Sequence, residues 1–463
     1  MNKPRTTQSN TLVNTVSRRK FLAGAAATGA GLMFLPRTRL FGADAPNNRL
    51  NIAMIGAWGR ASQHYNWLKH ENIVAICDVD KNNLAKGLAE FPGAATYEDW
   101  RKCLDHKGLD AIICCTPDHT HAFITCWALN RGLHVFMEKP LAITVNEART
   151  IRKKYLENKS KLATQAGTFR HAFPNVTRVR DMIQSGAVGN LKEVHAWGTS
   201  RWAVPSGYAP ADGSPPAHLN YDLWLGPSPD HPYNPEYFKY SQKPGLGCQA
   251  YNKYWDFGMG YAGDWGSHVF DIAWNALDAS LPSKIKAVSS EAYNPAITPL
   301  ELSAMFTVPA NSWRDEVRVV WHQGGKQPTV PAEWIDLEKF RNGALFKGDQ
   351  GFLLADFDNR VLLPYGKNAD LSYFTPKAKV DATPLIPSFF GEWTEACKNG
   401  NPANTSCNFD YGSNMIETLA LGLAAFRAGS ELTYDGSNGR ITNNDAANAF
   451  LTKPYRSGWI MDA

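Results

Sequence analysis

The chain has 463 residues, of which 44% are hydrophobic and 20% are charged, proportions that are typical of a globular protein. This composition excludes a wholly disordered chain and a multispan membrane protein. The length suits two or three domains that each bury a core. A net charge of +5, without a long basic run beyond the first forty residues, argues against nucleic acid as a partner.

Residues 1–45 resemble a twin-arginine export signal. Ser17-Arg18-Arg19-Lys20-Phe21-Leu22 precedes the mildly apolar stretch "AGAAATGAGLMFLP", which is too weakly hydrophobic for a good membrane-spanning helix. The alternative is a chance basic patch before a short helix. We expect the twin-arginine translocation machinery to export the protein to the periplasm, and the mature fold to begin near Arg49.

The stretch "LNIAMIGAWGRASQHYNWLK" begins at Leu50 with a β-branched run, continues through a glycine turn and then takes helical spacing. This pattern predicts the opening of a nucleotide-binding βαβ unit. Gly56 and Gly59 can let backbone amides at a helix N-terminus approach a pyrophosphate. The G-x-G-x-x-G fingerprint is incomplete, because Trp58 and Ala61 occupy its second and third glycine positions.

A second predicted strand, "NIVAICDVD", ends in Asp78, which comes 22 residues after Gly56. An acidic residue at that spacing can bind the ribose hydroxyls of the adenosine. Because its carboxylate would repel a 2′-phosphate, NAD is favoured over NADP, although NADP stays open. The alternative role for Asp78 or Asp80 is to cap the following helix.

Residues 108–151 alternate strand, loop and helix twice, which predicts a parallel sheet. The loops "TPDHTH" and "EKP" follow predicted strands, and ligands of such sheets bind at the carboxyl ends of the strands. His119 and His121 could form a metal pair, but no suitable third ligand is near, so no metal is predicted. Lys139, held between Glu138 and Pro140, is favoured as a functional residue over a solvated loop lysine.

The stretch "GDWGSHVFDIAWNALD", residues 263–278, predicts a helix over 264–277 with two stripes about 140° apart. We expect the core stripe to contain Val269, Ile272, Ala273, Ala276 and Leu277. The polar stripe contains Asp264, His268, Asp271 and Asn275. The alternative is that Asp264 caps the helix and His268 lies on the surface.

Together with "CTPDHTHA", "MEKP", "GTFRHAFPNVTRVRDMIQSGAVGNLKEVHA" and "NFDYGSNMIETLALGLAAFRAG", these motifs resemble the Gfo/Idh/MocA family of oxidoreductases over nearly the whole mature chain. The resemblance implies an α/β fold. Residues 49–167 would form an N-terminal Rossmann domain with a parallel sheet. Residues 168–463 would form a C-terminal α/β domain with a large, mostly antiparallel open sheet. One face of that sheet often joins subunits, so we expect a homo-oligomer, either a dimer or a tetramer.

The resemblance also assigns the site. It makes Lys139 the catalytic lysine, Asp264 and His268 the D-x-x-x-H pair, and Arg170 a residue that faces the substrate. We expect NAD to contact Gly56, Trp58, Gly59, Arg60, Asp78, Thr116, Pro117, His121, Glu138 and Lys139. Tyr254 and Trp255 are expected beside a sugar, because aromatic faces can stack on a pyranose.

The residues suit dehydrogenation of a sugar, polyol or glycoside. His268 can accept the hydroxyl proton, Lys139 can hydrogen-bond the reacting oxygen and Asp264 can orient the sugar or the imidazole, although the lysine and histidine could exchange roles. Export as a folded protein favours a tightly bound NAD. The alternatives are a redox-neutral glycosidase, which oxidises, eliminates and hydrates in turn, and a binding protein without turnover.

Overall fold

The computed structural model describes residues 48–200, 203–205, 207–208, 213–240, 249–330, 335–366 and 369–462. The predicted export signal lies outside these residues. Residues Arg49–Ala463 hold two β-sheets within one unit. No helix in this described part of the chain combines the length and the hydrophobicity that crossing a membrane requires.

The first sheet has the strand order β3-β2-β1-β4-β5-β6, and all its neighbouring strands are parallel, which confirms the predicted Rossmann architecture. Both faces of β4 and of most of β5 are buried, which accounts for their continuous apolar runs. The strands are β1 (Asn51–Ile55), β2 (Asn72–Cys77), β3 (Ala95–Tyr97), β4 (Ala111–Cys114), β5 (His134–Met137) and β6 (Thr164–Ala166). The helices are α2 (Tyr65–Leu68), α3 (Lys81–Glu90), α4 (Trp100–Cys103), α5 (His121–Asn130) and α6 (Val145–Asn158).

The second sheet has nine strands in the order β13-β12-β11-β7-β10-β9-β8-β14-β15. Only β7 and β10 pair in parallel among these strands, which confirms the mostly antiparallel sheet. The strands are β7 (Leu191–Gly198), β8 (Lys284–Val288), β9 (Leu302–Val308), β10 (Val317–Gln323), β11 (Asn342–Gly348), β12 (Gly351–Ala355), β13 (Arg360–Pro364), β14 (Leu432–Asp435) and β15 (Arg440–Ile441). The helices are α7 (Pro174–Gln184), α8 (Tyr221–Leu225), α9 (Ser267–Leu277), α10 (Phe389–Lys398) and α11 (Phe409–Ala428). The predicted domain boundary at residue 167 stays a prediction.

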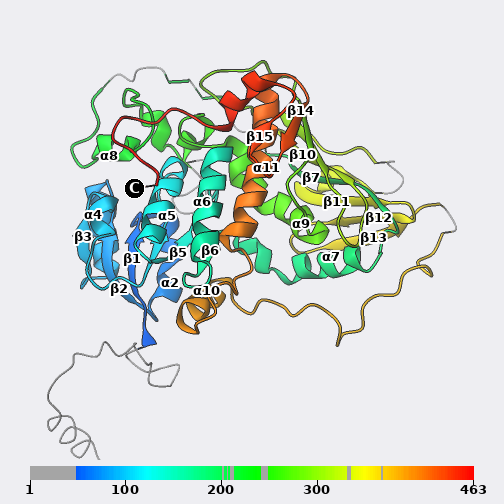
Figure 1. Cartoon of the computed structure of the whole chain (residues 1–463), viewed down its shortest axis with the longest axis horizontal. Helices are drawn as coiled ribbons and strands as arrows, with labels where there is room; N and C mark the ends of the chain where they lie inside the picture. The colour runs from blue at the N-terminus through cyan, green and yellow to red at the C-terminus, as the bar shows by residue number, and fades with distance from the viewer. Residues whose placement is uncertain are drawn as a thin grey trace, which may run out of the picture. The chain divides into compact units, whose positions relative to one another are not determined.

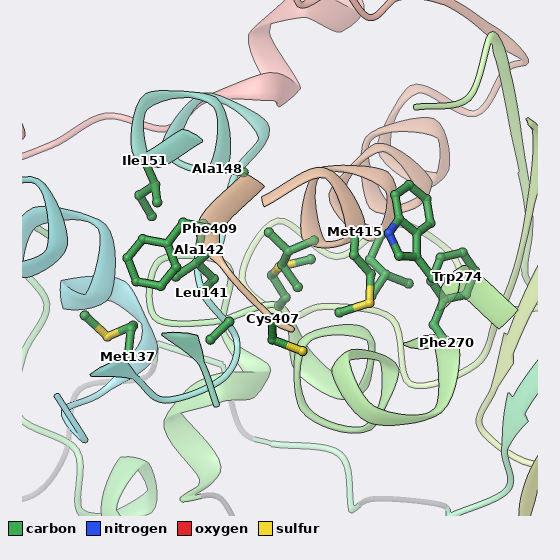
Figure 2. Close-up of a cluster of buried hydrophobic side chains, with 14 of the residues drawn as sticks. Met137, Leu141, Ala142, Ala148, Ile151, Phe270, Trp274, Cys407, Phe409 and Met415 are labelled. Atoms are coloured by element: carbon green, nitrogen blue, oxygen red, sulfur yellow. The ribbon is translucent and has the colours of Figure 1, made fainter. Parts of the chain in front are cut away.

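Helix α11 lies between the two sheets, beside α6 on one side and α9 on the other (Figure 1). Figure 2 shows Phe409 and Met415 of this helix between residues of the first half of the chain, such as Leu141, and Phe270 and Trp274 of α9. These side chains belong to one hydrophobic core that runs through both halves of the unit. Burial of that continuous apolar surface stabilises the position of each sheet against the other.

Helix α9 begins differently from the prediction. A π turn at Ala262–Gly266 precedes it, so Asp264 lies on the π turn and only His268 lies on the α-helix. The predicted core stripe is buried as expected, but every other residue of α9 is buried too, so the polar stripe faces protein rather than solvent. Single π turns are frequent at functional sites, because they shift side chains relative to a regular helix.

A buried polar contact ties α9 to a short 3-10 turn, Phe169–Ala172, that precedes α7. His171 Nδ1 lies 3.0 Å from Asp271 Oδ2, and the Tyr411 hydroxyl of α11 donates to Oδ1 of the same carboxylate. Burial lowers the pKa of His171, but the charge of Asp271 outweighs it and holds the pKa well above its ordinary value. The contact therefore joins a cationic imidazole to a carboxylate and fixes the turn that carries Arg170.

Replacement of His171 by Leu should cost about 3 to 5 kcal/mol of the free energy of unfolding at pH 6, because the buried Asp271 carboxylate loses its cationic partner and keeps only the Tyr411 hydroxyl among the described residues. Since the folded pKa of His171 is raised, its contribution is complete below the unfolded pKa and disappears as the pH rises through the folded pKa. Urea unfolding of both proteins should therefore show a smaller difference at pH 9 than at pH 6. His70→Leu, at an exposed position, is the matched control. A difference that grows with pH would contradict the ion pair.

Candidate active site

One cavity of about 1020 Å³ lies where the carboxyl ends of β1, β2, β4 and β5 meet the start of α9. Ordinary ligand pockets measure about 300 to 1000 Å³, so this cavity has room for a dinucleotide together with a small substrate. Most of the predicted site residues line it. These are Gly56, Trp58, Gly59, Arg60, Asp78, Thr116, Pro117, Glu138, Lys139, Arg170, Asp264 and His268.

The glycine turn after β1 is built for close approach. Gly56 has a φ of +85°, and a Cβ atom there would lie 2.7 Å from the carbonyl carbon and oxygen of Cys115. Asp78 Oδ2 accepts a hydrogen bond from the Ala57 amide at 2.9 Å, and its Oδ1 accepts one from the Asp80 amide. Asp78 therefore braces the turn while it lines the cavity. The helix cap that the sequence analysis gave as an alternative role for Asp78 or Asp80 is made by Asp80, at the start of α3.

Glu138 lines the cavity and accepts hydrogen bonds from two side chains. Its Oε1 accepts from Arg60 Nε and His64 Nε2, both at 2.8 Å. Trp67 Nε1 donates to His64 Nδ1, which places the imidazole proton on Nε2. Burial raises the pKa of Glu138, but Arg60 and then His64 outweigh burial and hold that pKa well below its ordinary value. Glu138 is thus an anionic anchor for Arg60 at the cavity wall.

His121 is not among the residues that line the cavity, and its prediction as a cofactor contact stays a prediction. The ring is buried, with Nδ1 2.7 Å from the Pro140 carbonyl oxygen and Nε2 2.9 Å from the Thr116 carbonyl oxygen. It therefore links the two loops that carry Thr116 and Lys139. His119 is also buried, and its Nε2 donates to the Trp224 carbonyl at 2.8 Å. In His121 both ring nitrogens face backbone carbonyls, whereas in His119 only Nε2 does.

Lys139 and Asp264 form an ion pair across the cavity, from the end of β5 to the π turn before α9. Their side chains are only 14% and 13% exposed, so water screens this pair much less than a surface pair. Gly263 allows the two segments to approach, because a Cβ atom there would lie 2.8 Å from Met259 Cβ and 3.3 Å from Pro140 Cγ. The lysine is thereby held beside the carboxylate inside the cavity.

His268 lies one helical turn beyond Asp264 and is 5% exposed. Burial, followed by the charges of Lys139 and Arg170, holds its pKa well below the ordinary value, so the imidazole is neutral near pH 7. Its Nδ1 has no hydrogen-bond partner among the described residues. A neutral imidazole with an unused nitrogen in a ligand cavity is suited to accept a proton.

Three aromatic rings surround the Arg170 guanidinium. Its guanidinium carbon lies 4.9 Å from the ring centroid of Phe169, 5.2 Å from that of Trp265 and 5.0 Å from that of Phe357. Burial lowers the pKa of Arg170 from its ordinary value. These rings restrain the guanidinium of Arg170, which lines the cavity.

The structure does not place Tyr254 and Trp255 at the cavity. Tyr254 is fully buried in a separate cluster with Trp224, Tyr237 and Phe257. Trp255 donates from Nε1 to the Asn294 carbonyl and stacks with Arg427. Aromatic side chains without a clear period serve a core as readily as a sugar, and both rings are used here in packing. Their place beside a substrate stays a prediction.

Sequence reasoning missed a segment that contributes to the cavity lining. We call residues 213–240 and 249–257 the cover segment. The Asn220 amide donates to the Val79 carbonyl at 2.9 Å, the Lys81 amide donates to the His218 carbonyl at 2.9 Å, and the Tyr251 hydroxyl donates to Asp118 Oδ1 at 3.0 Å. The cover segment thus packs on the loops after β2 and β4, and it contributes Leu219, Trp224, Tyr240 and Tyr251 to the cavity lining.

Comparison with known proteins agrees with this architecture. A family model described as "Oxidoreductase family, NAD-binding Rossmann fold" matches residues 50–166. A second, "Oxidoreductase family, C-terminal alpha/beta domain", matches residues 174–305, and the two cover more than half of the chain. The chain belongs to the Gfo/Idh/MocA oxidoreductase family.

Individual family members are distant. Inositol 2-dehydrogenase of Rubrobacter xylanophilus is 29% identical over 171 residues, which are 34% of this chain and 49% of that protein. Glycosyl hydrolase family 109 protein 2 of Phocaeicola vulgatus is 30% identical over 160 residues, 32% of this chain and 38% of that protein. The matches thus span about half or less of these relatives' length.

A solved structure extends the likeness to the whole fold. WlbA dehydrogenase from Bordetella pertussis, in complex with NADH and UDP-GlcNAcA, superposes with a TM-score of 0.57 at 14% identity. The superposition covers 84% of this chain and 99% of that one. At this identity the likeness shows the shared fold.

The cavity fits the NAD that the family model implies. Gly56 leaves backbone space that any Cβ atom would fill, and this space lies at the end of β1, where a pyrophosphate approaches in a Rossmann sheet. Asp78 lines the cavity one strand away, where a carboxylate can accept from ribose hydroxyls. The backbone turn and Asp78 would hold the nucleotide.

Gly56→Ala should lower the affinity for NADH at least about tenfold, because Ala is strained at positive φ and its Cβ would press on Cys115. NADH fluorescence titration measures the Kd. Gly93→Ala is the matched control, since a Cβ atom there meets nothing within 4 Å. An unchanged Kd in Gly56→Ala would remove the glycine turn from the nucleotide site.

Proposed function

We propose that the protein is an NAD-dependent oxidoreductase that oxidises a hydroxyl of a sugar, polyol or glycoside. The observation that carries the proposal is the Lys139–Asp264 ion pair with His268 beside it, in a cavity that also contains the nucleotide-binding turn. The names of the relatives, an inositol dehydrogenase among them, support a polyol or sugar as the substrate class.

A bound nicotinamide supplies the hydride acceptor. The chain's own residues then handle the hydroxyl, which must lose its proton as its carbon loses the hydride. Neutral His268 accepts that proton through its unused nitrogen, and Lys139 hydrogen-bonds the oxygen while negative charge develops there. Asp264 holds the Lys139 ammonium in place. The neutral state of His268 and the pairing of Lys139 favour this division of roles over the reverse one.

We propose NAD rather than NADP as the cofactor, bound tightly. The Asp78 carboxylate at the cavity would repel a 2′-phosphate. The cover segment supports slow exchange, because it is held on the loop after β2 by backbone hydrogen bonds and on the loop after β4 by the Tyr251–Asp118 hydrogen bond. A retained cofactor also suits a protein exported folded through the twin-arginine pathway, which we propose together with a homo-oligomeric state.

A second candidate is redox-neutral glycoside hydrolysis, in which transient oxidation acidifies a neighbouring C–H bond, the glycosidic bond is eliminated and water is then added. The similarity to glycosyl hydrolase family 109 protein 2 supports glycoside hydrolysis as this second candidate. The same Lys139, Asp264 and His268 would serve the oxidation step. The two functions differ in their final products, which a single assay separates.

The test is absorbance at 340 nm when sugars, polyols and glycosides are added to the full-length protein with its bound nucleotide. A lasting rise with no glycosidic cleavage supports the oxidoreductase, whereas sugar release without lasting reduction supports the glycosidase. Neither change with any compound, in a protein that retains nucleotide, would contradict both and leave a binding protein.

Lys139→Ala should lower kcat about 100- to 1000-fold, the loss typical when a group that stabilises a developing oxyanion is removed. Nucleotide content, measured after denaturation, should stay that of the wild type, because the glycine turn and Asp78 are untouched. Lys161→Ala, at an exposed loop position, is the matched control. A Lys139→Ala protein with wild-type kcat would remove the lysine from the reaction.

A further inference from the structure

Asp118 is a buried acid in the active-site cavity that the mechanism above does not use. It follows Thr116 and Pro117 after β4 and is 4% exposed, yet it lines the cavity. Its Oδ1 accepts a hydrogen bond from the Tyr251 hydroxyl of the cover segment at 3.0 Å. Its Oδ2 is also buried, and no described residue donates a hydrogen bond to it.

The charges of Lys139 and Asp264 both act on Asp118. Burial raises the pKa of Asp118, Lys139 lowers it and Asp264 raises it, and the net result is a pKa of about 7. Asp118 therefore shares its surroundings with the Lys139–Asp264 pair.

An unpaired carboxylate oxygen in a buried position is unfavourable, and such oxygens in proteins ordinarily find a donor. Here the described residues supply a donor to one oxygen only, and the other oxygen is buried on a residue that lines the cavity. Sugars and polyols carry several hydroxyl donors. Lys139 and His268 engage only the hydroxyl that reacts, so the remaining hydroxyls need acceptors elsewhere in the cavity.

We propose that Asp118 Oδ2 accepts a hydrogen bond from a second hydroxyl of the substrate, one that is not oxidised. This makes Asp118 a specificity-determining residue, because it favours the epimer that directs a hydroxyl toward it. The inference rests on the proposed function. A site that hydrogen-bonds a substrate hydroxyl discriminates strongly against the analogue that lacks it, since the buried polar group is then left unpaired.

The test pairs Asp118→Ala with deoxy analogues of the best substrate from the panel, in the full-length protein with its bound nucleotide. Wild-type kcat/KM should fall about 10- to 100-fold for one deoxy analogue, the loss expected for a hydrogen bond to a charged group. Asp118→Ala should lower kcat/KM for the parent sugar by a similar factor. The Asp118→Ala protein should then have the same kcat/KM for that analogue as for the parent sugar, because the hydroxyl has lost its partner.

Nucleotide content and the thermal midpoint are measured on the same variant, and Asp105→Asn, on an exposed acid, is the matched control. The proposal would be overturned if, for every deoxy analogue, the loss of kcat/KM from Asp118→Ala and the loss from the missing hydroxyl were additive. A loss of bound nucleotide with kcat/KM for the sugar unchanged in reconstituted protein would also overturn it, because Oδ2 would then serve the cofactor. Absence of turnover in the wild type would instead refute the proposed function itself.

Discussion

The Lys139–Asp264 ion pair forms only if the two halves of the unit keep their relative position. The lysine comes from the end of a strand in the parallel sheet, and the carboxylate comes from the π turn before α9, 125 residues later in the chain. Both side chains are largely removed from water. Loss of either partner would leave a buried charge unpaired, so the pair requires both halves to keep their relative position.

Several layers of the fold hold that position. The core around α11 joins α6 to α9, as Figure 2 shows, and the His171–Asp271–Tyr411 contact fixes the turn that carries Arg170 to α9 and α11. His121 joins the loops after β4 and β5. These residues contact no substrate in our account, and they act by keeping Lys139, Asp264 and Arg170 in one geometry.

Several polar groups around the cavity hydrogen-bond to one another, which makes the polar atoms without a protein partner candidates for ligand binding. Glu138 is used by Arg60 and His64, and Asp78 is used by the backbone of the glycine turn. His268 Nδ1 and Asp118 Oδ2 have no partner in the described part of the chain. Trp100 Nε1, on another residue of the cavity lining, also has no partner among the described residues. Because buried polar atoms are normally satisfied, these atoms are candidates to meet a ligand.

Strand–helix alternation predicted the parallel sheet and the loops at its carboxyl end, because it fixes where the ends of parallel strands meet. The antiparallel sheet and the grouping of Lys139, Asp264 and His268 came from the family resemblance. Sequence reasoning was limited where long-range contacts decide. Nothing local in Tyr254 distinguishes a core ring from a sugar platform, and the cover segment is held by hydrogen bonds to distant loops, which leave no periodicity. The orientation of His121 could not be predicted for the same reason, since the strand-end loop predicts proximity but not which way a side chain points.

The central claim is that a sugar carbon and the nicotinamide exchange a hydride in this one cavity. Transfer of deuterium tests it most directly. A sugar that the protein turns over would be labelled at each oxidisable carbon in turn, and the bound nucleotide would be recovered after a single turnover for mass spectrometry. The account predicts that one labelled position delivers one deuterium to the nucleotide, and that Lys139→Ala abolishes the transfer. Product formed with no deuterium in the nucleotide from any position would contradict it.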